Sequence, residues 1–164
     1  MSTLNYTQYG LSPSIELGLS DDAEAIPFKV TLEVDGGQIS LNYGVVGEDV
    51  DYIPVTCNTK VEIELVGEQL YFSKEWDAIT TKEALSSYYG GLEYSNYDKE
   101  LDRYKTVTFQ ARYNQGGKLG TNHRFNINVD LLQGTRCEPR WIGLTIDPDI
   151  KNPPPNGSGI QNQR

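Results

Sequence analysis

The residues with the most distinctive chemistry are the dipeptide Asp147-Pro148, near the end of the chain. An aspartate side chain can attack its own main-chain carbonyl through a five-membered ring, and the tertiary-amide nitrogen of proline is a comparatively basic leaving group. If the fold buries Asp147, its pKa rises and it holds the proton that the departing nitrogen needs, while a second carboxylate activates water. Self-cleavage between Asp147 and Pro148 is therefore chemically available.

Other motifs with known catalytic or metal-binding chemistry are missing from the sequence. It contains no G-x-S-x-G, Walker or H-E-x-x-H motif. Its one histidine, His123, lies beside Arg124 at a turn-to-strand junction, where an exposed imidazole is the ordinary expectation. Closely spaced carboxylates occur in segments 21–24, 48–51 and 147–149, but none matches the twelve-residue calcium loop. We therefore expect no metal and no cofactor.

A second candidate site is a group of tyrosines around Gly90-Gly91. Tyrosine rings on a glycine-flexible loop are typical of platforms that stack on sugars or contact proteins. The alternative is that some of these rings pack against a sheet while their hydroxyl groups reach water. The candidate binding residues are Tyr88, Tyr89, Tyr94 and Tyr97, with Tyr104 nearby.

The elements that must position these residues are strands. Segments 28–34 and 39–43 alternate apolar and polar residues, and Asp35-Gly36-Gly37 between them supplies residues that tolerate positive φ. This pattern predicts a β-hairpin.

The same alternation recurs in further segments, which we expect to be strands: 61–65, 70–72, 107–113, 125–131 and 141–146. Gly67-Glu68 predicts a second hairpin between the first two, and 114–117 predicts a turn. Thr80 and Glu83 have the spacing of a capping box, so the segment from Thr81 to Tyr88 predicts one or two helical turns.

Seven or eight strands with at most one short helix predict an all-β, single-domain antiparallel β-sandwich. A closed barrel is the alternative architecture. We expect an N-terminal arm over residues 1–25, the sandwich over 26–150, and a flexible Pro/Asn/Gly-rich tail over 151–164.

Composition limits the partners and the compartment. With 14 Lys+Arg against 23 Asp+Glu, the net charge is −9, so nucleic acids and anionic membranes are poor candidate partners. No apolar run approaches the ~20 residues that span a bilayer, and the first residues lack the pattern of a signal peptide. We therefore expect a cytoplasmic protein in which Cys57 and Cys137 are reduced and partly buried.

The segment from Leu144 to Pro153 resembles the corresponding segment of the DP-EP family of bacterial β-sandwich proteins. The opening strand Pro27–Leu32 and the strand Arg124–Val129 support the resemblance, which extends from Ile26 to Pro155. It implies a single-domain sandwich that acts as a self-processing aspartic peptidase. In such a protein the activated aspartate is cut by water or captured by a lysine to form an isopeptide bond.

The resemblance implies that Asp147 and Pro148 are the catalytic residues. The position where a lysine is expected is occupied by Arg124, whose guanidinium cannot accept an acyl group. The insertion from Gln133 to Arg140 also lengthens the connection to the last strand. Hydrolysis, or no reaction, is therefore favoured over cross-linking, and an ion pair of Arg124 with Asp147 would suppress cleavage by lowering the pKa of the carboxyl.

The alternative function is a non-catalytic binding or assembly module. In this interpretation the tyrosine-rich loop or an exposed sheet edge meets a glycan or a protein partner. A hydrolase that acts on other molecules has almost no support, because no pair of nucleophile and base is visible.

Overall fold

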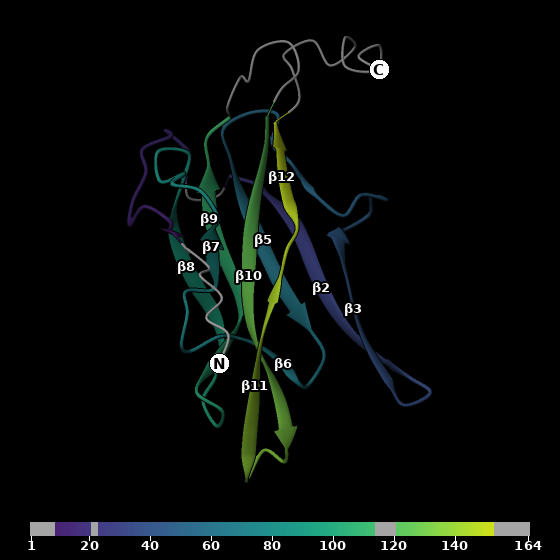
Figure 1. Ribbon diagram of the computed structural model, residues 1–164. Coiled ribbons are helices and arrows are strands. Elements are labelled where there is room, and N and C mark those ends of the chain that lie inside the picture. Colours follow the sequence, from purple (N-terminus) through teal and green to yellow (C-terminus); the bar gives the residue numbers. More distant parts are fainter. Residues whose placement is uncertain (1–8, 21–22, 114–120, 153–164) are drawn as a thin grey trace.

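Two β-sheets pack face to face in the computed structural model, which describes residues 9–20, 23–113 and 121–152 (Figure 1). The first sheet has, in order, β1 (Tyr9–Gly10), β7 (Ile79–Thr81), β10 (Thr121–Gly134), β12 (Asp149–Asn152) and β4 (Ile53–Pro54), with β6 (Leu70–Phe72) and β11 (Pro139–Ile146) also paired to β10. The second sheet has β3 (Gln38–Val45), β2 (Ala25–Asp35), β5 (Thr59–Val66), β9 (Arg103–Ala111) and β8 (Tyr89–Asp98). The predicted all-β sandwich is confirmed.

The strand count depends on the shortest strands. In the described part of the chain, eight strands have four or more residues and four have two or three. The short strand β6 was predicted, whereas the ten-residue strand β8 was expected to be a glycine-flexible loop. Most pairs are antiparallel, whereas β2 with β5 and β12 with β4 are parallel. Among the described residues, no helix is long and apolar enough to cross a membrane.

The first predicted hairpin is confirmed. β2 and β3 pair from Phe28 with Val45 to Asp35 with Gln38. The two residues between them, Gly36 and Gly37, have φ of 58° and 83°, the left-handed values that a tight two-residue turn requires.

The second predicted hairpin is wrong. β5 lies in the second sheet between β2 and β9, whereas β6 pairs with β10 in the first sheet. The chain therefore crosses from one sheet to the other at Gly67-Glu68. An alternating pattern identifies the buried face of a strand, but it does not identify the neighbouring strand.

The helical turns predicted over Thr81 to Tyr88 are also absent. Thr81 ends β7, where it pairs with Phe125 of β10. The hydroxyl of Thr80, the expected capping residue, accepts the side-chain amides of Asn126 and Asn128 instead. Only one turn follows, in which Tyr88 and Tyr89 N–H groups both donate to the carbonyl of Leu85. Pairing with a central strand has overridden a weak local helix signal.

Several predictions fall partly outside the described residues. The predicted turn over 114–117 lies outside them, and the strands on either side of it, β9 and β10, belong to opposite sheets. β1 lies within the predicted arm and pairs with β7, and β12 ends at Asn152. The division into arm, domain and tail stays a prediction.

From Phe125 to Leu132, β10 is buried on both faces. Phe125, Ile127 and Val129 point into the core between the sheets and are fully buried. The alternate residues Asn126 and Asn128 are polar, yet they are buried too. Their amides donate to the hydroxyl of Thr80, and Asn128 also donates to the carbonyl of Asp77 and accepts from the hydroxyl of Thr145. These hydrogen bonds offset the cost of removing the amides from water.

An ion pair between Arg103 and Asp130 joins the two sheets. Arg103 begins β9, Asp130 lies on β10, and the guanidinium Nε is 2.9 Å from the carboxylate. The side chains are only 12% and 10% exposed, and the guanidinium also stacks 3.7 Å from the ring centre of Trp141. Asp130 further accepts the main-chain N–H of Lys74. Removing one partner of such a buried pair is strongly destabilising, because the other charge is left buried without a counter-charge.

We expect Asp130→Asn to lower the free energy of unfolding by about 3 kcal/mol, because it leaves the Arg103 guanidinium without a carboxylate in a nearly dry place. Urea unfolding measures this value. Glu64→Gln is the control, since Glu64 forms an exposed pair with Lys29 at 3.8 Å and should cost less than about 1 kcal/mol. Equal small losses in both variants would contradict the importance of the buried pair.

Candidate functional site

Asp147 and Pro148 join β11 to β12 along one edge of β10 and form no turn. Ile146 pairs with Ile127 at the end of β11, Asp149 pairs with Arg124 at the start of β12, and the N–H of Phe125 donates to the carbonyl of Pro148. The register is the same on both sides of the dipeptide. Because alternate residues point to opposite faces, Ile146 and Pro148 are buried and Asp147 is exposed.

The Asp147 side chain lies at the surface in an ion pair. The Nζ of Lys82 lies 2.8 and 2.9 Å from its two oxygens, and the Asp147 side chain is 48% exposed. The cation beside it is therefore Lys82, which follows β7, and not the expected Arg124. Self-cleavage needs a carboxyl that is buried away from water, whereas Asp147 is exposed and ion-paired.

We expect the chain to stay intact during days of incubation near neutral pH, with one mass spectrum peak for both the wild type and Asp147→Asn. The substitution removes only an exposed ion pair and should lower the free energy of unfolding by no more than about 1 kcal/mol. A fragment that begins at Pro148, present in the wild type and absent from the variant, would overturn this expectation.

The predicted tyrosine platform is divided between the core and the surface. Tyr89 is fully buried, and its hydroxyl lies 2.6 Å from Nδ1 of His123. Tyr88 packs beside the same imidazole, with ring centres 5.6 Å apart. Tyr88 and Tyr89 therefore support the core, whereas Tyr94 and Tyr97 lie on the exposed part of β8.

His123 and the cysteines also differ from expectation. His123 is buried, not exposed, and burial lowers the pKa of its imidazole. Cys57 and Cys137 are free thiols, as expected, but both are exposed rather than partly buried. Among the described residues, no group of three or more His, Cys, Asp or Glu side chains is placed to hold a metal ion.

Tyr94, Tyr97 and Tyr104 form a row of rings where β8 and β9 approach their shared turn. The ring centre of Tyr104 lies 5.2 Å from that of Tyr94 and 4.8 Å from that of Tyr97. Tyr97 also donates a hydrogen bond to Asp102, which in turn pairs with Lys74. Three exposed or half-exposed rings in contact make a surface suited to stacking on a flat ligand.

We call the hollow beside this row the aromatic hollow. It lies where the loop between β6 and β7 meets the β8–β9 hairpin, and its volume is about 270 Å³. Its most exposed ring belongs to Trp76, which is 49% exposed. The residues that line it include Lys74, Glu75, Trp76, Asp77, Tyr94, Arg103 and Tyr104.

The loop that carries Trp76 is fixed by hydrogen bonds at both ends. The hydroxyl of Ser73 accepts the N–H groups of Glu75 and Trp76, both at 3.1 Å. At the other end, the N–H of Ala78 donates to the hydroxyl of Tyr94 at 2.9 Å. The carbonyl of Asn128 on β10 accepts the N–H of Ser73. Trp76 is therefore displayed by a preorganised turn, although the sequence analysis did not single it out.

The charges at the aromatic hollow are of both signs. Arg103 forms the buried pair with Asp130. Lys74 pairs with Asp102 at 2.6 Å, and the side chains of Lys74 and Asp102 are more than half exposed. An exposed pair is weak and exchanges readily with other anions. Glu75 and Asp77 supply carboxylates that can accept N–H or O–H groups.

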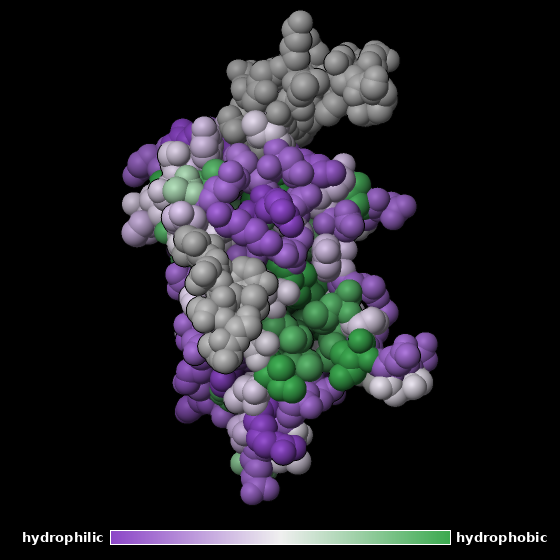
Figure 2. Space-filling model, viewed as in Figure 1, coloured by the Kyte–Doolittle hydropathy of each residue, from purple (hydrophilic) through white to green (hydrophobic). Residues whose placement is uncertain are grey.

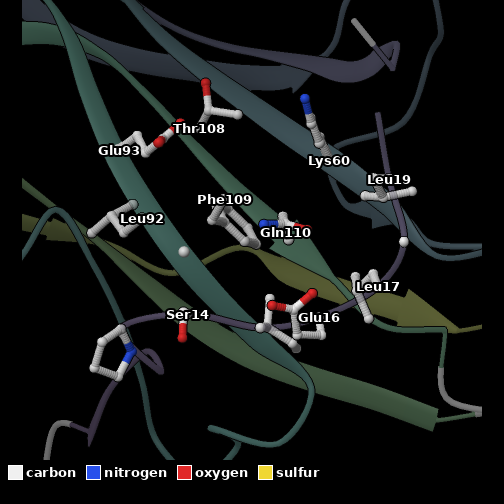
Figure 3. Close-up of a pocket in the computed structure, with 14 residues that line it drawn as sticks. Ser14, Glu16, Leu17, Leu19, Lys60, Leu92, Glu93, Thr108, Phe109 and Gln110 are labelled. Carbon is white, nitrogen blue, oxygen red and sulfur yellow. The ribbon is translucent and has the colours of Figure 1, made fainter. Parts of the chain in front are cut away.

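A second hollow of about 530 Å³ lies beneath the segment Pro13–Leu19 and against β5, β8 and β9 (Figure 3). We call this segment the strap. It is anchored at Ser12, which exchanges main-chain hydrogen bonds with Tyr89 and Gly91. A Cβ at Gly90 would lie 2.8 Å from the carbonyl oxygen of Ser12, so this contact requires glycine. The hollow displays one cation, Lys60, and no open aromatic face, since Phe109 is fully buried.

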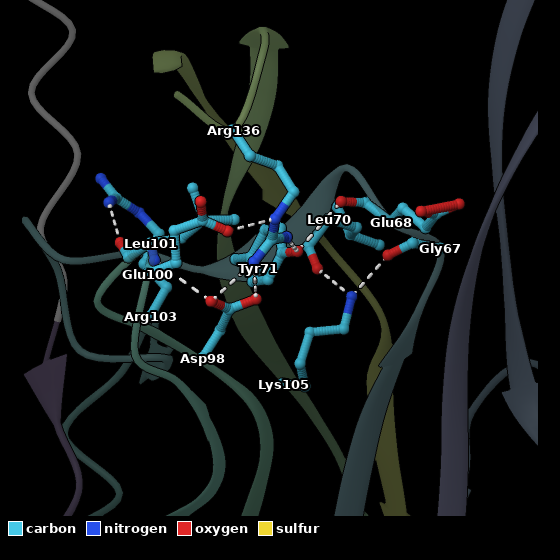
Figure 4. Close-up of polar contacts among 10 residues, drawn as sticks. All are labelled: Gly67, Glu68, Leu70, Tyr71, Asp98, Glu100, Leu101, Arg103, Lys105 and Arg136. Carbon is cyan, nitrogen blue, oxygen red and sulfur yellow. Dashed lines mark hydrogen bonds and ion pairs between the residues drawn. The ribbon is translucent and has the colours of Figure 1, made fainter. Parts of the chain in front are cut away.

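A network of cations and carbonyls closes the end of the sandwich near the β8–β9 turn (Figure 4). Arg136 bonds to Asp98 and Glu100, which holds the turn after β10 against the turn after β8. Lys105 donates to the carbonyls of Gly67 and Leu70. Burial lowers the pKa of Lys105 to about 8.

The lowered pKa of Lys105 gives a pH dependence with a defined sign. From about 8 up to the ordinary value of 10.5, the folded chain has lost this proton while the unfolded chain still holds it. Because the unfolded state binds more protons in this window, stability from this group rises with pH. The free energy of unfolding of the wild type, minus that of Lys105→Met, should therefore increase across the window.

Urea unfolding at several pH values across this window measures the difference. Lys29→Met is the matched control, because Lys29 is an exposed lysine on β2. A difference between the wild type and Lys105→Met that stays flat or falls as the pH rises would contradict the assignment.

These features define the class of protein as an open β-sandwich whose ordered surface turn presents aromatic rings. Over residues 1–155, the sequence matches the model of the family pNTSase1, described as a predicted novel nucleotide synthetase, and the chain belongs to this family. No curated protein matches the chain.

The family membership corrects two interpretations of the sequence. The resemblance to the DP-EP family is wrong, and so is the self-cleaving aspartic peptidase that it implied, because the matching family is described as a nucleotide synthetase. The exposed, ion-paired Asp147 agrees with this correction. The alternative, a non-catalytic module for a glycan or protein, receives no better support from the family.

Proposed function

We propose that this protein binds a nucleotide as part of the nucleotide synthesis that its family's description predicts, and that the aromatic hollow holds the base. The observation that carries the proposal is the open face of Trp76 beside Tyr94 and Tyr104 on a turn that is already ordered. Stacking of a base on an aromatic side chain contributes about 1–3 kcal/mol and works for every base.

The size of the aromatic hollow favours a base over a whole nucleotide. Its volume of about 270 Å³ is just below the range of about 300–1,000 Å³ for pockets that enclose drug-sized ligands. A base would lie against Trp76, and the sugar and phosphates would extend toward the exposed ammonium of Lys74. Lys74 would exchange its weak pair with Asp102 for a phosphate oxygen.

The remaining carboxylates support the same orientation. Glu75 and Asp77 repel phosphate, so they favour binding with the phosphates on the Lys74 side. Their oxygens accept hydrogen bonds, which suits the N–H edge of a base or the hydroxyl groups of a ribose. The strap hollow is the weaker candidate, because it offers Lys60 without a ring on which a base can stack.

We expect ATP, GTP, CTP or UTP to quench the tryptophan fluorescence of the wild-type protein and to bind measurably by calorimetry. Trp76→Ala should weaken binding by about tenfold or more, because it removes the stacking surface. Trp76→Phe should retain part of the affinity, since a smaller ring still stacks.

Tyr52→Ala is the matched control, because Tyr52 is an aromatic residue with a cation above its ring, Lys151 at 4.2 Å, outside the aromatic hollow. It should leave nucleotide binding unchanged. Either of two results would overturn the proposal: no binding of any of the four nucleotides at millimolar concentration, or equal affinity in the wild type and Trp76→Ala.

We also propose that the protein acts in the cytoplasm. Two free, exposed thiols, Cys57 and Cys137, suit a reducing compartment, where such cysteines stay unpaired.

A further inference from the structure

β11 is an open edge of the first sheet. Within the described part of the chain it pairs with β10 on one side and with no strand on the other. Ile142 and Leu144 lie opposite Leu131 and Val129 and share their inward face, yet they are 48% and 37% exposed. Figure 2 shows apolar surface gathered beside β11 and over β2 and β3 on the same side of the molecule.

The other sheet edges are guarded in ways that β11 is not. The edge of β12 is covered by β4, which pairs with it at Ile150 and Lys151. β8 carries Glu93 and Asp98 and has an irregular register after Gly90. From Trp141 to Ile146, by contrast, β11 has no charge, no proline and no irregularity. Charges, bulges and covering segments are the devices that keep edge strands from pairing with other chains.

Among the described strands of eight or more residues, β3 is another edge without a charged residue, but its end is covered. The segment after β3 folds back, so that the N–H of Val45 donates to the carbonyl of Val50. That carbonyl oxygen would lie only 2.6 Å from a Cβ at Gly44. From Trp141 to Ile146, β11 is therefore a long edge that no charge interrupts and no described segment covers.

We propose that two copies of this chain associate by antiparallel pairing of β11 with β11, centred on Gly143. In this register each Ile142 lies opposite the Leu144 of the other copy, so the two exposed apolar side chains of each strand cover those of its partner. The same patch meets itself, as a two-fold symmetric interface requires.

The charges favour a second copy at this edge. Because the net charge is −9, two copies of the chain repel each other over most of their surfaces. Along Trp141 to Ile146, two copies meet without opposing carboxylates. At each end of this pairing, Pro139 of one copy is opposite Asp147 of the other. Arg140 is next to Pro139 in the chain, so a positive and a negative charge flank each end of the interface. This interface is independent of the proposed nucleotide site.

Sedimentation velocity and light scattering test the association across micromolar to millimolar concentrations. The mass should rise from the 18.4 kDa of one chain toward twice that value, and more readily at higher salt, which screens the net charge. Leu144→Lys should weaken the association by about tenfold or more, because it places an ammonium against an apolar side chain. Ile39→Lys, at an exposed apolar residue of β3, is the matched control and should leave the association unchanged.

A disulfide provides a test of the register. In a chain with Cys57→Ser and Cys137→Ser, Gly143→Cys should form a symmetric disulfide dimer, because opposite residues of an antiparallel pair lie at about the Cα separation that a disulfide bridges. A Cβ at Gly143 meets only ordinary contacts, so the substitution should not disturb the fold. Ser40→Cys, on the edge of β3, is the control and should cross-link much more slowly.

Three results would each overturn the proposal. The first is a single-chain mass at every concentration. The second is a dimer that Leu144→Lys leaves intact. The third is equal cross-linking through positions 40 and 143, which would indicate chance collisions.

Discussion

The hydrogen-bonding demand of β10 organises this protein. Fourteen consecutive residues run through the middle of the first sheet, and each edge of the strand needs partners because its main-chain groups are buried. β7 and β6 pair successively along one edge, while β12 and β11 pair successively along the other. Since neither face of the strand meets open water, its outward residues form side-chain hydrogen bonds. A polar ladder through Asn126 and Asn128 and the Arg103–Asp130 pair are the result.

The aromatic hollow is a consequence of the same arrangement. β6 and β7 both pair with β10, so the loop that joins them starts opposite Val129 and ends opposite Ile127, two residues apart on that strand. The loop must bulge outward between those points, and Ser73 and Tyr94 hold the bulge in one shape. Trp76 is therefore presented to solvent by a rigid element. A preorganised ring loses little freedom when a flat ligand stacks on it.

Alternating apolar residues were sufficient to predict most of the long strands, the first hairpin and the two-layer fold. They missed β8, where exposed polar and tyrosine residues follow two glycines and no apolar alternation occurs. They were insufficient to pair the strands, because β5 and β6 have the same alternation whether they face each other or belong to different sheets. The same alternation also indicated that the Asp147 side chain is exposed, which the argument for self-cleavage did not take into account. Ile146, Pro148 and Ile150 occupy the inward positions, so a side chain between them must point outward.

The residues of the candidate site were harder to predict from the sequence, because their positions depend on contacts between distant segments. Lys82 is far from Asp147 in sequence, and only the pairing of β7 with β10 brings it within 2.8 Å. Tyr89 carries the same side chain as Tyr94, but the strand turns one into the core and leaves the other exposed. Trp76 had one local signal, a serine three residues earlier that can hold a turn. No periodic pattern marks such a residue, since its role depends on a loop.

The contact of Gly90 with the strap also restricts how this sequence can change. The carbonyl oxygen of Ser12 occupies the space where any other residue would place its first side-chain carbon. Descendants of this chain that keep the strap seated are thus bound to glycine at position 90, whereas they are free to vary the strap's own exposed side chains. Two parts of the chain that touch each other therefore differ in their tolerance to mutation. Deep mutational scanning would record position 90 as intolerant and the strap as permissive.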